Sequence, residues 1–447
     1  MNQKQILTEG SVLKSLIIFA IPVLSSLFLQ AMYGAADLII VGQFSNTYEQ
    51  SAVASGSQLF NLIVMVITGL SMGITVFIGD NIGAKNFEKV SKGVQTGITI
   101  FAFVAIVITV VSVIFSDALA SFLHAPKEAY QQTSDYIKIC GIGTIFITGY
   151  NVIGAIFRGM GDSKTPLFTV FIACIINILG DLILVGVFDM GAKGAAIATI
   201  LAQAISVIFS YIFIKKKKLP LTFQSLSNFI DKESFKKILI VGLPIGLQEL
   251  LVQFSFVFVQ MVVNDIGVNE SAAIGVSEKV CVFLMLVSSA YMQSISAFVA
   301  QNNGASKYER SKKALMYGMK MALLSGSIMA ISAFFGGDLL SKIFSNNLEV
   351  IVYSHQYLKA YAIDTILTAL LFCFIGYFNG CGKTIFVMIQ GIIGAFCVRI
   401  PIVFVMSQLD NTSLFLIGLA TPISSMVQII LCIVAYVVYN KRIRHLF

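Results

Sequence analysis

Two aspartates stand inside apolar runs that are long enough to cross a membrane. Asp37 lies in LQAMYGAADLIIVGQF and Asp181 lies in INILGDLILVG, and neither run contains a basic residue. An isolated carboxylate in hydrocarbon costs several kcal/mol, so such a residue usually faces a cavity or a partner. Two neighbouring carboxylates in a low dielectric cannot both ionise cheaply, and they share a proton or take up a cation. These aspartates are therefore the first candidates for chemistry.

Polar side chains accompany the two aspartates. Asn177 lies four residues before Asp181, on the same face of a helix. Counting at roughly 1.5 Å per residue from the ends of the spans places both acids and Thr199 in the outer half of the bilayer. We predict a cation-coupling site formed by Asp37, Asn177, Asp181 and Thr199, and a wider substrate or polar network formed by Tyr33, Tyr136 and Asn151. The alternative for the neutral groups is that they only hydrogen-bond between helices.

Other titratable groups inside the apolar runs are weaker candidates. Glu249 and Asp364 fall within spans of the second half, where they either mark a second cation or substrate site or are single polar groups facing a cavity. The seven cysteines show no CxxC spacing and the three histidines are dispersed. We therefore expect no disulfide framework, no cofactor and no metal site other than Na⁺ at the predicted coupling site, with Na⁺ or H⁺ as the coupling ion.

The composition is that of an integral membrane protein. Of the 447 residues, 57% are hydrophobic and 12% are charged, and the mean hydropathy is +0.89. Roughly 20 apolar residues suffice for one crossing. We predict an all-α protein with twelve transmembrane helices, over about 15–41, 52–78, 95–116, 135–157, 167–188, 194–214, 238–263, 272–300, 314–335, 354–378, 384–406 and 413–439. The first run is too long for a signal peptide, so we expect it to stay in the mature protein.

Lysine and arginine gather in alternate loops. One set of loops holds the tetralysine at 215–218 and most of the other basic residues, whereas the alternate set has little beyond Lys127, Lys193 and Lys342. By the positive-inside rule, the basic loops and both termini are cytoplasmic. The net charge of +8 follows from this orientation, and no nucleic-acid partner is needed to explain it. We expect a multi-pass protein of the cell membrane whose tetralysine contacts anionic lipid headgroups.

Landmarks of the first half return in the second half at an offset of about 221 residues, a symmetry that many transporters carry. FAIPVL with Pro22 is answered by VGLPIG with Pro244, DNIGA by QNNGA, and IFRGMG by YFNGCG. The predicted domains are an N-terminal six-helix lobe (1–214), a cytoplasmic linker (215–237) and a C-terminal six-helix lobe (238–447). Because six is even, both lobes start on the same side, and a pseudo-two-fold axis runs along the membrane normal. The proline inside the first span permits a bend there.

The duplication fails at the acidic residues. The offset carries Asp37 onto apolar residues near Val259, and it carries Asn177 and Asp181 to a stretch in which Arg399 stands in place of an acid. The coupling chemistry is therefore expected in the first lobe.

Taken in order, the motifs resemble the multidrug and toxic compound extrusion (MATE) family. The resemblance covers nearly the whole chain and rests on ADLIIVGQF, GDNIGAKN, FRGMGDSKTP and NILGDLILVG. Within the family the chain is similar to the DinF-like branch, whose first-lobe site matches Asp37, Asn177, Asp181 and Thr199 and whose polar network matches Tyr33, Tyr136 and Asn151. The resemblance implies efflux of organic, often cationic, compounds by alternating access, driven by Na⁺ or H⁺, with a bend of the first span near Pro22. Glu249 and Asp364 do not match the second-lobe acids of the NorM-like branch cleanly.

Three other readings share part of this pattern. A lipid-linked oligosaccharide flippase of the same superfamily needs a strongly cationic cavity for pyrophosphate, and few basic residues lie within the spans. A major-facilitator carrier also has six plus six spans, but the residues around DNIG differ from its loop. A membrane-embedded enzyme needs a set such as HExxH, which the sequence lacks. We expect a transporter and not an enzyme, and a monomer suffices for two lobes.

Overall fold

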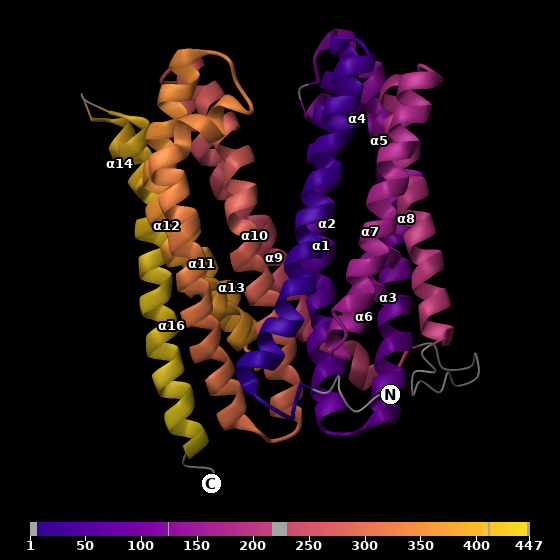
Figure 1. Cartoon of the computed structure of the whole chain (residues 1–447), viewed down its shortest axis with the longest axis vertical. Coiled ribbons are helices and arrows are strands. Elements are labelled where there is room, and N and C mark those ends of the chain that lie inside the picture. The colour runs from indigo at the N-terminus through magenta and orange to yellow at the C-terminus, as the bar shows by residue number, and fades with distance from the viewer. Residues whose placement is uncertain (1–6, 124, 217–229, 410–411, 445–447) are drawn as a thin grey trace. The chain divides into compact units, whose positions relative to one another are not determined.

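The computed structural model describes residues 7–123, 125–216, 230–409 and 412–444, and all regular structure within these ranges is helical (Figure 1). Eleven of the described helices are long and apolar enough to cross a membrane, and a bent helix pair supplies a twelfth crossing. The predicted twelve-span membrane fold is therefore confirmed for these ranges. Residues 217–229 of the predicted linker 215–237 lie outside the described residues.

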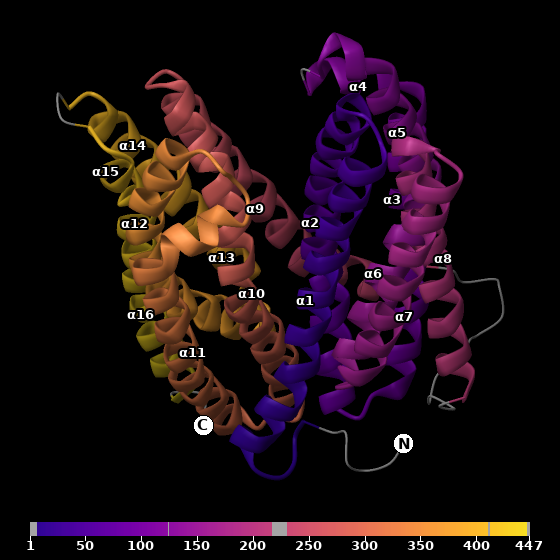
Figure 2. The same cartoon turned by 45° about the horizontal axis from the view of Figure 1, so that its top comes forward.

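Contacts divide the chain into two compact units. Unit 1 comprises Met1–Glu9, Ile18–Gly246 and Ala300–Ser306, and unit 2 comprises Gly10–Ile17, Leu247–Val299 and Lys307–Phe447. Each unit thus combines most of one half of the sequence with a short segment from the other half. Within each unit the long helices run side by side (Figures 1 and 2).

Unit 1 is built mainly from the first helices of the chain. These helices are α1 (Val12–Phe44), α2 (Thr47–Gly83), α3 (Phe87–Ile114), α4 (Ser116–Phe122), η2 (Lys127–Ala129), α5 (Tyr130–Ile142), α6 (Thr144–Gly159), α7 (Lys164–Asp181), the π-helical η3 (Leu182–Val187) and α8 (Gly191–Lys216). The N-terminal part of α9 (Lys232–Asn264) and the C-terminal end of α10 (Val268–Gly304) also belong to unit 1.

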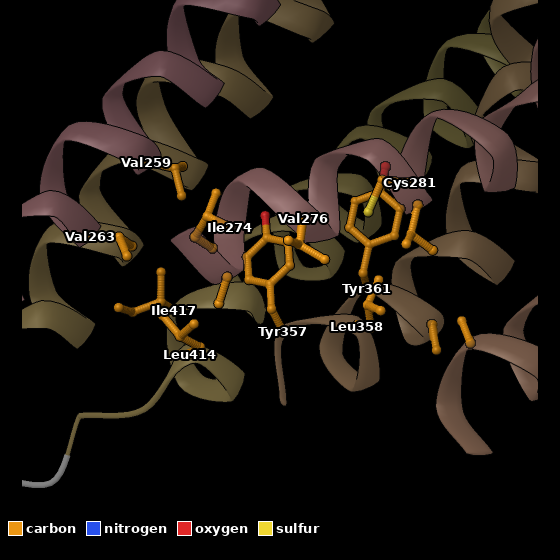
Figure 3. Packing of buried hydrophobic residues seen from close by; sticks show 14 of the residues in the cluster. Val259, Val263, Ile274, Val276, Cys281, Tyr357, Leu358, Tyr361, Leu414 and Ile417 are labelled. Carbon is orange, nitrogen blue, oxygen red and sulfur yellow. The ribbon is translucent and has the colours of Figure 1, made fainter. Parts of the chain in front are cut away.

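Unit 2 holds the remainder of α9 and α10 and the later helices. These are α11 (Tyr308–Lys342), α12 (Leu348–Gly380), α13 (Thr384–Ile392), the π-helical η4 (Ile393–Arg399), α14 (Ile400–Ser407), α15 (Leu414–Gly418) and α16 (Ala420–Arg444). A buried apolar cluster joins α9, α10, α12 and α15 through Val259, Ile274, Tyr357, Leu358 and Ile417 (Figure 3).

Short polar residues set where the long helices begin. Asn46 accepts a hydrogen bond from the backbone of Glu49 at the start of α2, and Asn86 does the same for α3. Asp162 accepts hydrogen bonds from the backbone nitrogens of the first two residues of α7, both at 3.1 Å. Such caps satisfy amide groups that a helix leaves without partners in its first turn. The chain can therefore turn between spans within a few residues.

The fourth predicted span, 135–157, is not a single straight helix. The structure breaks it at Gly143, where the axis from Lys127–Ile142 to Thr144–Gly159 bends by 50°. A Cβ atom on Gly143 would overlap the side chain of Ile200 on α8. The glycine therefore permits a close approach to α8, and glycine is a common site of such kinks.

Backbone conformations repeat between the two halves of the sequence. Lys85 and Ser306, both at φ of 58°, are 221 residues apart. Gly161 and Gly382 also lie 221 residues apart, and their φ values are 83° and 68°. The same left-handed turns thus end the paired helices in each half, as an internal duplication requires.

Candidate functional site

Asp37 on α1 and Asp181 at the end of α7 lie near each other inside unit 1, and their carboxyl groups influence each other electrostatically. Their exposed fractions are 6% and 0%. Thr199 on α8 donates a hydrogen bond from Oγ1 to Oδ2 of Asp37 at 3.2 Å, and Asn177 donates from Nδ2 to the same Thr199 oxygen at 3.3 Å. The structure therefore brings together all four residues predicted for cation coupling. Their role remains a prediction.

A close approach of α7 and α8 positions this cluster. A Cβ atom on Gly180 would lie 2.9 Å from the Cβ of Ala198, so the glycine lets the two backbones come near each other. Asn177 and Thr199 flank this contact and reach hydrogen-bonding distance. Directly after Asp181, α7 changes to the π-helical turn η3, a feature that is common at functional sites.

The cluster presents buried oxygen atoms that have no hydrogen-bond donor. These atoms are Oδ1 of Asp37, Oδ1 of Asn177, and both carboxylate oxygens of Asp181. Ionised carboxylates can only accept hydrogen bonds, and leaving one buried polar group unsatisfied costs about 1–3 kcal/mol. A proton or a small cation satisfies such a set, because buried charges require a partner or a metal ion.

A second contact joins α1 to α8 one helical turn away from the first. Gln203 on α8 donates from Nε2 to the hydroxyl oxygen of Tyr33 on α1 at 3.2 Å, and its Oε1 has no donor. The two contacts, Thr199 to Asp37 and Gln203 to Tyr33, are four residues apart on each helix. Sequence reasoning missed Gln203, although its spacing from Thr199 places both on one face of α8.

The remaining members of the predicted polar network separate into two places. Tyr136 on α5 is 3% exposed, packs against Gly56 of α2 and interacts electrostatically with both aspartates. Asn151 on α6 accepts a hydrogen bond from Thr68 at 3.2 Å and donates one to the backbone oxygen of Ile147 at 2.9 Å. Tyr136 thus borders the acid cluster, whereas Asn151 forms a contact between α2 and α6.

Pro22 lies inside α1, fifteen residues before Asp37. It has no backbone N–H, so one carbonyl of the preceding turn loses its helical partner. The carbonyl of Pro22 itself accepts a second donor, the hydroxyl of Ser26, at 2.8 Å. A bend of α1 at this point remains a prediction.

The two acids predicted for the second half lie in different surroundings within unit 2. Asp364 on α12 is 1% exposed and accepts hydrogen bonds from Ser425 at 2.6 Å and from Thr368 at 3.0 Å. For Glu249 on α9, the interactions of the described residues include no hydrogen bond or ion pair. The structure therefore does not bring the two together into a site like that of unit 1.

Among the described residues, no group of three or more His, Cys, Asp or Glu side chains could hold a metal ion. The donors around Asp37 are instead two carboxylates with neutral amide and hydroxyl oxygens. Oxygen donors of this kind accept a proton or a hard cation, and the set has none of the nitrogen or sulfur donors that transition metals prefer.

Comparisons with known proteins agree with this architecture. The chain is 25% identical over 431 residues to "Probable multidrug resistance protein YoeA" of Bacillus subtilis, covering 95% of this chain and 93% of that one. It is also 25% identical over 400 residues to "Probable multidrug resistance protein NorM" of Thermotoga maritima, covering 88% and 85% of the two chains. A solved structure described as the outward-facing conformation of a multidrug resistance MATE family transporter of the MOP superfamily superposes with a TM-score of 0.91 at 20% identity, over 100% of this chain and 99% of that chain.

A family model described as MatE matches the chain twice, over residues 22–183 and again over residues 244–405. Two matches to one model are what an internal duplication predicts. Together they span most of the sequence, and so the chain belongs to the MatE family of multi-pass membrane transporters.

Proposed function

We propose that this protein exports organic, often cationic, compounds from the cell in exchange for Na⁺ or H⁺. Its family is one of transporters and not of enzymes. The names of relatives such as YoeA and NorM refer to multidrug resistance. One observation supports ion coupling above all others, namely the buried, unpartnered oxygens around Asp37 and Asp181.

The exchange follows from the chemistry of that cluster. Without a bound ion, two adjacent carboxylates repel each other and their oxygens lack donors, so this state is costly. A proton or Na⁺ removes the repulsion and satisfies Asp37, Asn177 and Asp181 together. A cationic substrate offers the same compensation, so ion and substrate oppose each other's binding. This opposition is reciprocal by linkage, and it is sufficient for antiport.

A change in the conformation of α1 transmits ion binding at Asp37 to the rest of unit 1. Thr199 ties Asp37 to α8, so protonation or ion binding at Asp37 alters the hydrogen bond that holds α1 there. Pro22 supplies a weak point in the same helix. We propose that ion binding displaces the substrate either by direct competition or by a bend of α1 near Pro22, within an alternating-access cycle. The basic loops and both termini face the cytoplasm in this scheme.

The test is dye efflux from proteoliposomes under separately imposed Na⁺ and pH gradients. The variants are Asp37→Asn and Asp181→Asn, each compared with the parent. We expect one gradient to drive efflux in the parent, and both substitutions to abolish driven efflux while the protein elutes as a folded monodisperse species. The active gradient then identifies the coupling ion.

Asp265→Asn is a suitable control, because Asp265 is an exposed residue between α9 and α10 and its replacement makes the same change of charge. It should leave driven efflux unchanged. Efflux that survives both Asp37→Asn and Asp181→Asn would show that the coupling site lies elsewhere, and Glu249 would be the next residue to replace.

A further inference from the structure

Unit 2 carries a buried arginine within one residue of the position where the duplication places a neutral amide in unit 1. The two family-model matches begin at residues 22 and 244, which are 222 apart, and the same shift carries Asn177 to Arg399. Arg399 is the last residue of the π-helical η4 and is 5% exposed. The shift also carries Asp37 to Val259, a residue of the buried apolar cluster in unit 2. The halves therefore share a fold but not an electrostatic pattern.

Arg399 is held against α9 by two contacts. Its Nη1 donates a hydrogen bond to the hydroxyl of Ser255 at 2.7 Å, and its guanidinium carbon lies 4.2 Å from the ring centroid of Phe256. Neither contact neutralises the positive charge, and Nε has no acceptor. A buried cation of this kind requires an anion in the same region, because an uncompensated buried charge costs several kcal/mol.

Asp364 is the buried acid that interacts electrostatically with Arg399, although the two side chains do not form a direct ion pair. Its Oδ1 accepts a hydrogen bond from Ser425 on α16, and its Oδ2 accepts one from Thr368 on its own helix. A second connection fixes the two helices, because Ser424 donates a hydrogen bond at 2.7 Å to the backbone of Gly394 in η4. Asp364 therefore has a donor on each oxygen and a resident positive charge nearby.

The acid cluster of unit 1 differs in both respects. Asp37 and Asp181 leave three carboxylate oxygens without a donor. The groups that interact with them are each other, Asn177, Thr199 and neutral side chains that include Tyr33 and Tyr136, and no lysine or arginine is among these. The acid pair of unit 1 thus has no positively charged side chain beside it, whereas Asp364 of unit 2 has Arg399.

From this contrast we propose that Arg399 is the internal counter-ion of Asp364 and prevents Asp364 from binding a coupling ion. Arg399 is then a specificity-determining residue, since it keeps the coupling ion from this acid of unit 2. Loss of this single positive charge would turn Asp364, with its hydroxyl neighbours, into a second cation site. The inference rests on the proposed function, because it concerns the same ion that Asp37 and Asp181 are proposed to bind.

The test counts the coupling ions bound by the purified full-length protein in detergent. Equilibrium dialysis with radioactive Na⁺ gives the count if Na⁺ drives transport, and proton release on raising the pH, followed with an indicator dye, gives it if H⁺ does. We expect Arg399→Gln to bind one ion more than the parent. The extra ion should disappear in Arg399→Gln/Asp364→Asn. Arg399→Lys is the matched control, because it keeps the charge and should bind no extra ion.

Two results would overturn the inference. The first is an unchanged ion count in Arg399→Gln. The second is a lower count in Asp364→Asn made in the otherwise unchanged protein, because this would mean that Asp364 already binds an ion. If Arg399→Gln does not yield folded protein, the ion count of Asp364→Asn decides alone. A count equal to that of the parent then supports the proposal.

Failure of the proposed function gives a different pattern. In that case the parent binds no ion that depends on Asp37 and Asp181. The comparison of Arg399→Gln with Arg399→Gln/Asp364→Asn is then repeated with Asp37→Asn present in both. An ion bound only by the first of these proteins still supports the role of Arg399, and its absence rejects that role independently of unit 1.

Discussion

Replacement of Asp181 by asparagine should make the stability of the protein independent of the coupling ion. An ion that binds only the folded state stabilises it by RT ln(1 + [L]/Kd), which is about 2.7 kcal/mol at a hundredfold excess over Kd. In the parent the ion supplies what the buried oxygens of Asp37 and Asp181 lack. Asparagine at position 181 removes one of the two charges, and with it the demand for an ion.

The same substitution should stabilise the protein when no ion is present. Asp181 is fully buried, and neither of its carboxylate oxygens has a donor. Each unsatisfied buried group costs about 1–3 kcal/mol, and the amide of asparagine adds a donor beside the free Oδ1 of Asp37. We therefore expect ion-free Asp181→Asn to be more stable than the ion-free parent by about 1–3 kcal/mol, close to the gain that the parent obtains from the ion.

Thermal unfolding in detergent measures both effects, with Na⁺ replaced by K⁺ at constant ionic strength if Na⁺ is the coupling ion, and with the pH raised if H⁺ is. For a domain of 150–250 residues, 1 kcal/mol corresponds to about 2–4 °C, so the ion should raise the Tm of the parent by about 5–10 °C. The Tm of Asp181→Asn should change by less than about 2 °C on the same scale. An ion-dependent shift of Tm in Asp181→Asn equal to that of the parent would refute the reasoning.

Three further predictions test the packing of unit 1 and its surroundings. Gly304→Ala should lower the free energy of unfolding by about 1–3 kcal/mol, because the added Cβ would overlap the backbone of α2. The control is Gly275→Ala in the same helix, where the added Cβ meets no atom within 4 Å and should not destabilise the protein. Equal Tm values for the two variants would contradict this. In a double-mutant cycle, Gln203→Leu and Tyr33→Phe should show a coupling of about 0.5–1.5 kcal/mol, and purely additive losses would rule out their hydrogen bond. Hydrogen bonds from Ser234 hold the pKa of Asp231 below its ordinary value, so the ionised carboxylate stabilises the folded protein. Asp231→Ala should therefore be less stable than the parent at pH 7, and this difference in stability should disappear as the pH falls below about 4. A difference that does not depend on pH would contradict this.

The sequence predicts the spans and the duplication well because both depend on local composition. A run of about 20 apolar residues identifies a crossing whatever it packs against. The break at Gly143 was not predictable in this way, because it arises from a contact with Ile200 on another helix. The π-helical turns η3 and η4 likewise follow from how backbones pack, and no residue type marks them.

The charged residues of the candidate site could be predicted from the sequence, because a buried charge is costly and therefore rare. Asp37 and Asp181 stand out because carboxylates in apolar runs are rare. Gln203 did not, because a neutral side chain costs less to bury and many such groups only join helices. Asp364 was a weaker candidate that the sequence did not distinguish from Glu249, and the structure separates the two by showing the donors to Asp364 and the nearby Arg399, which is 35 positions later in the sequence.

The segments exchanged between the two units have a consequence for biosynthesis. Unit 1 includes Ala300–Ser306, and the backbone of Leu7 donates a hydrogen bond to Gln301 across 294 residues. At a synthesis rate of 5–20 residues per second, these partners leave the ribosome about 15–60 s apart. Unit 1 therefore completes its contacts only after about the first third of the C-terminal lobe has been made, and a chaperone or the insertion machinery has a long interval in which to hold the unfinished bundle.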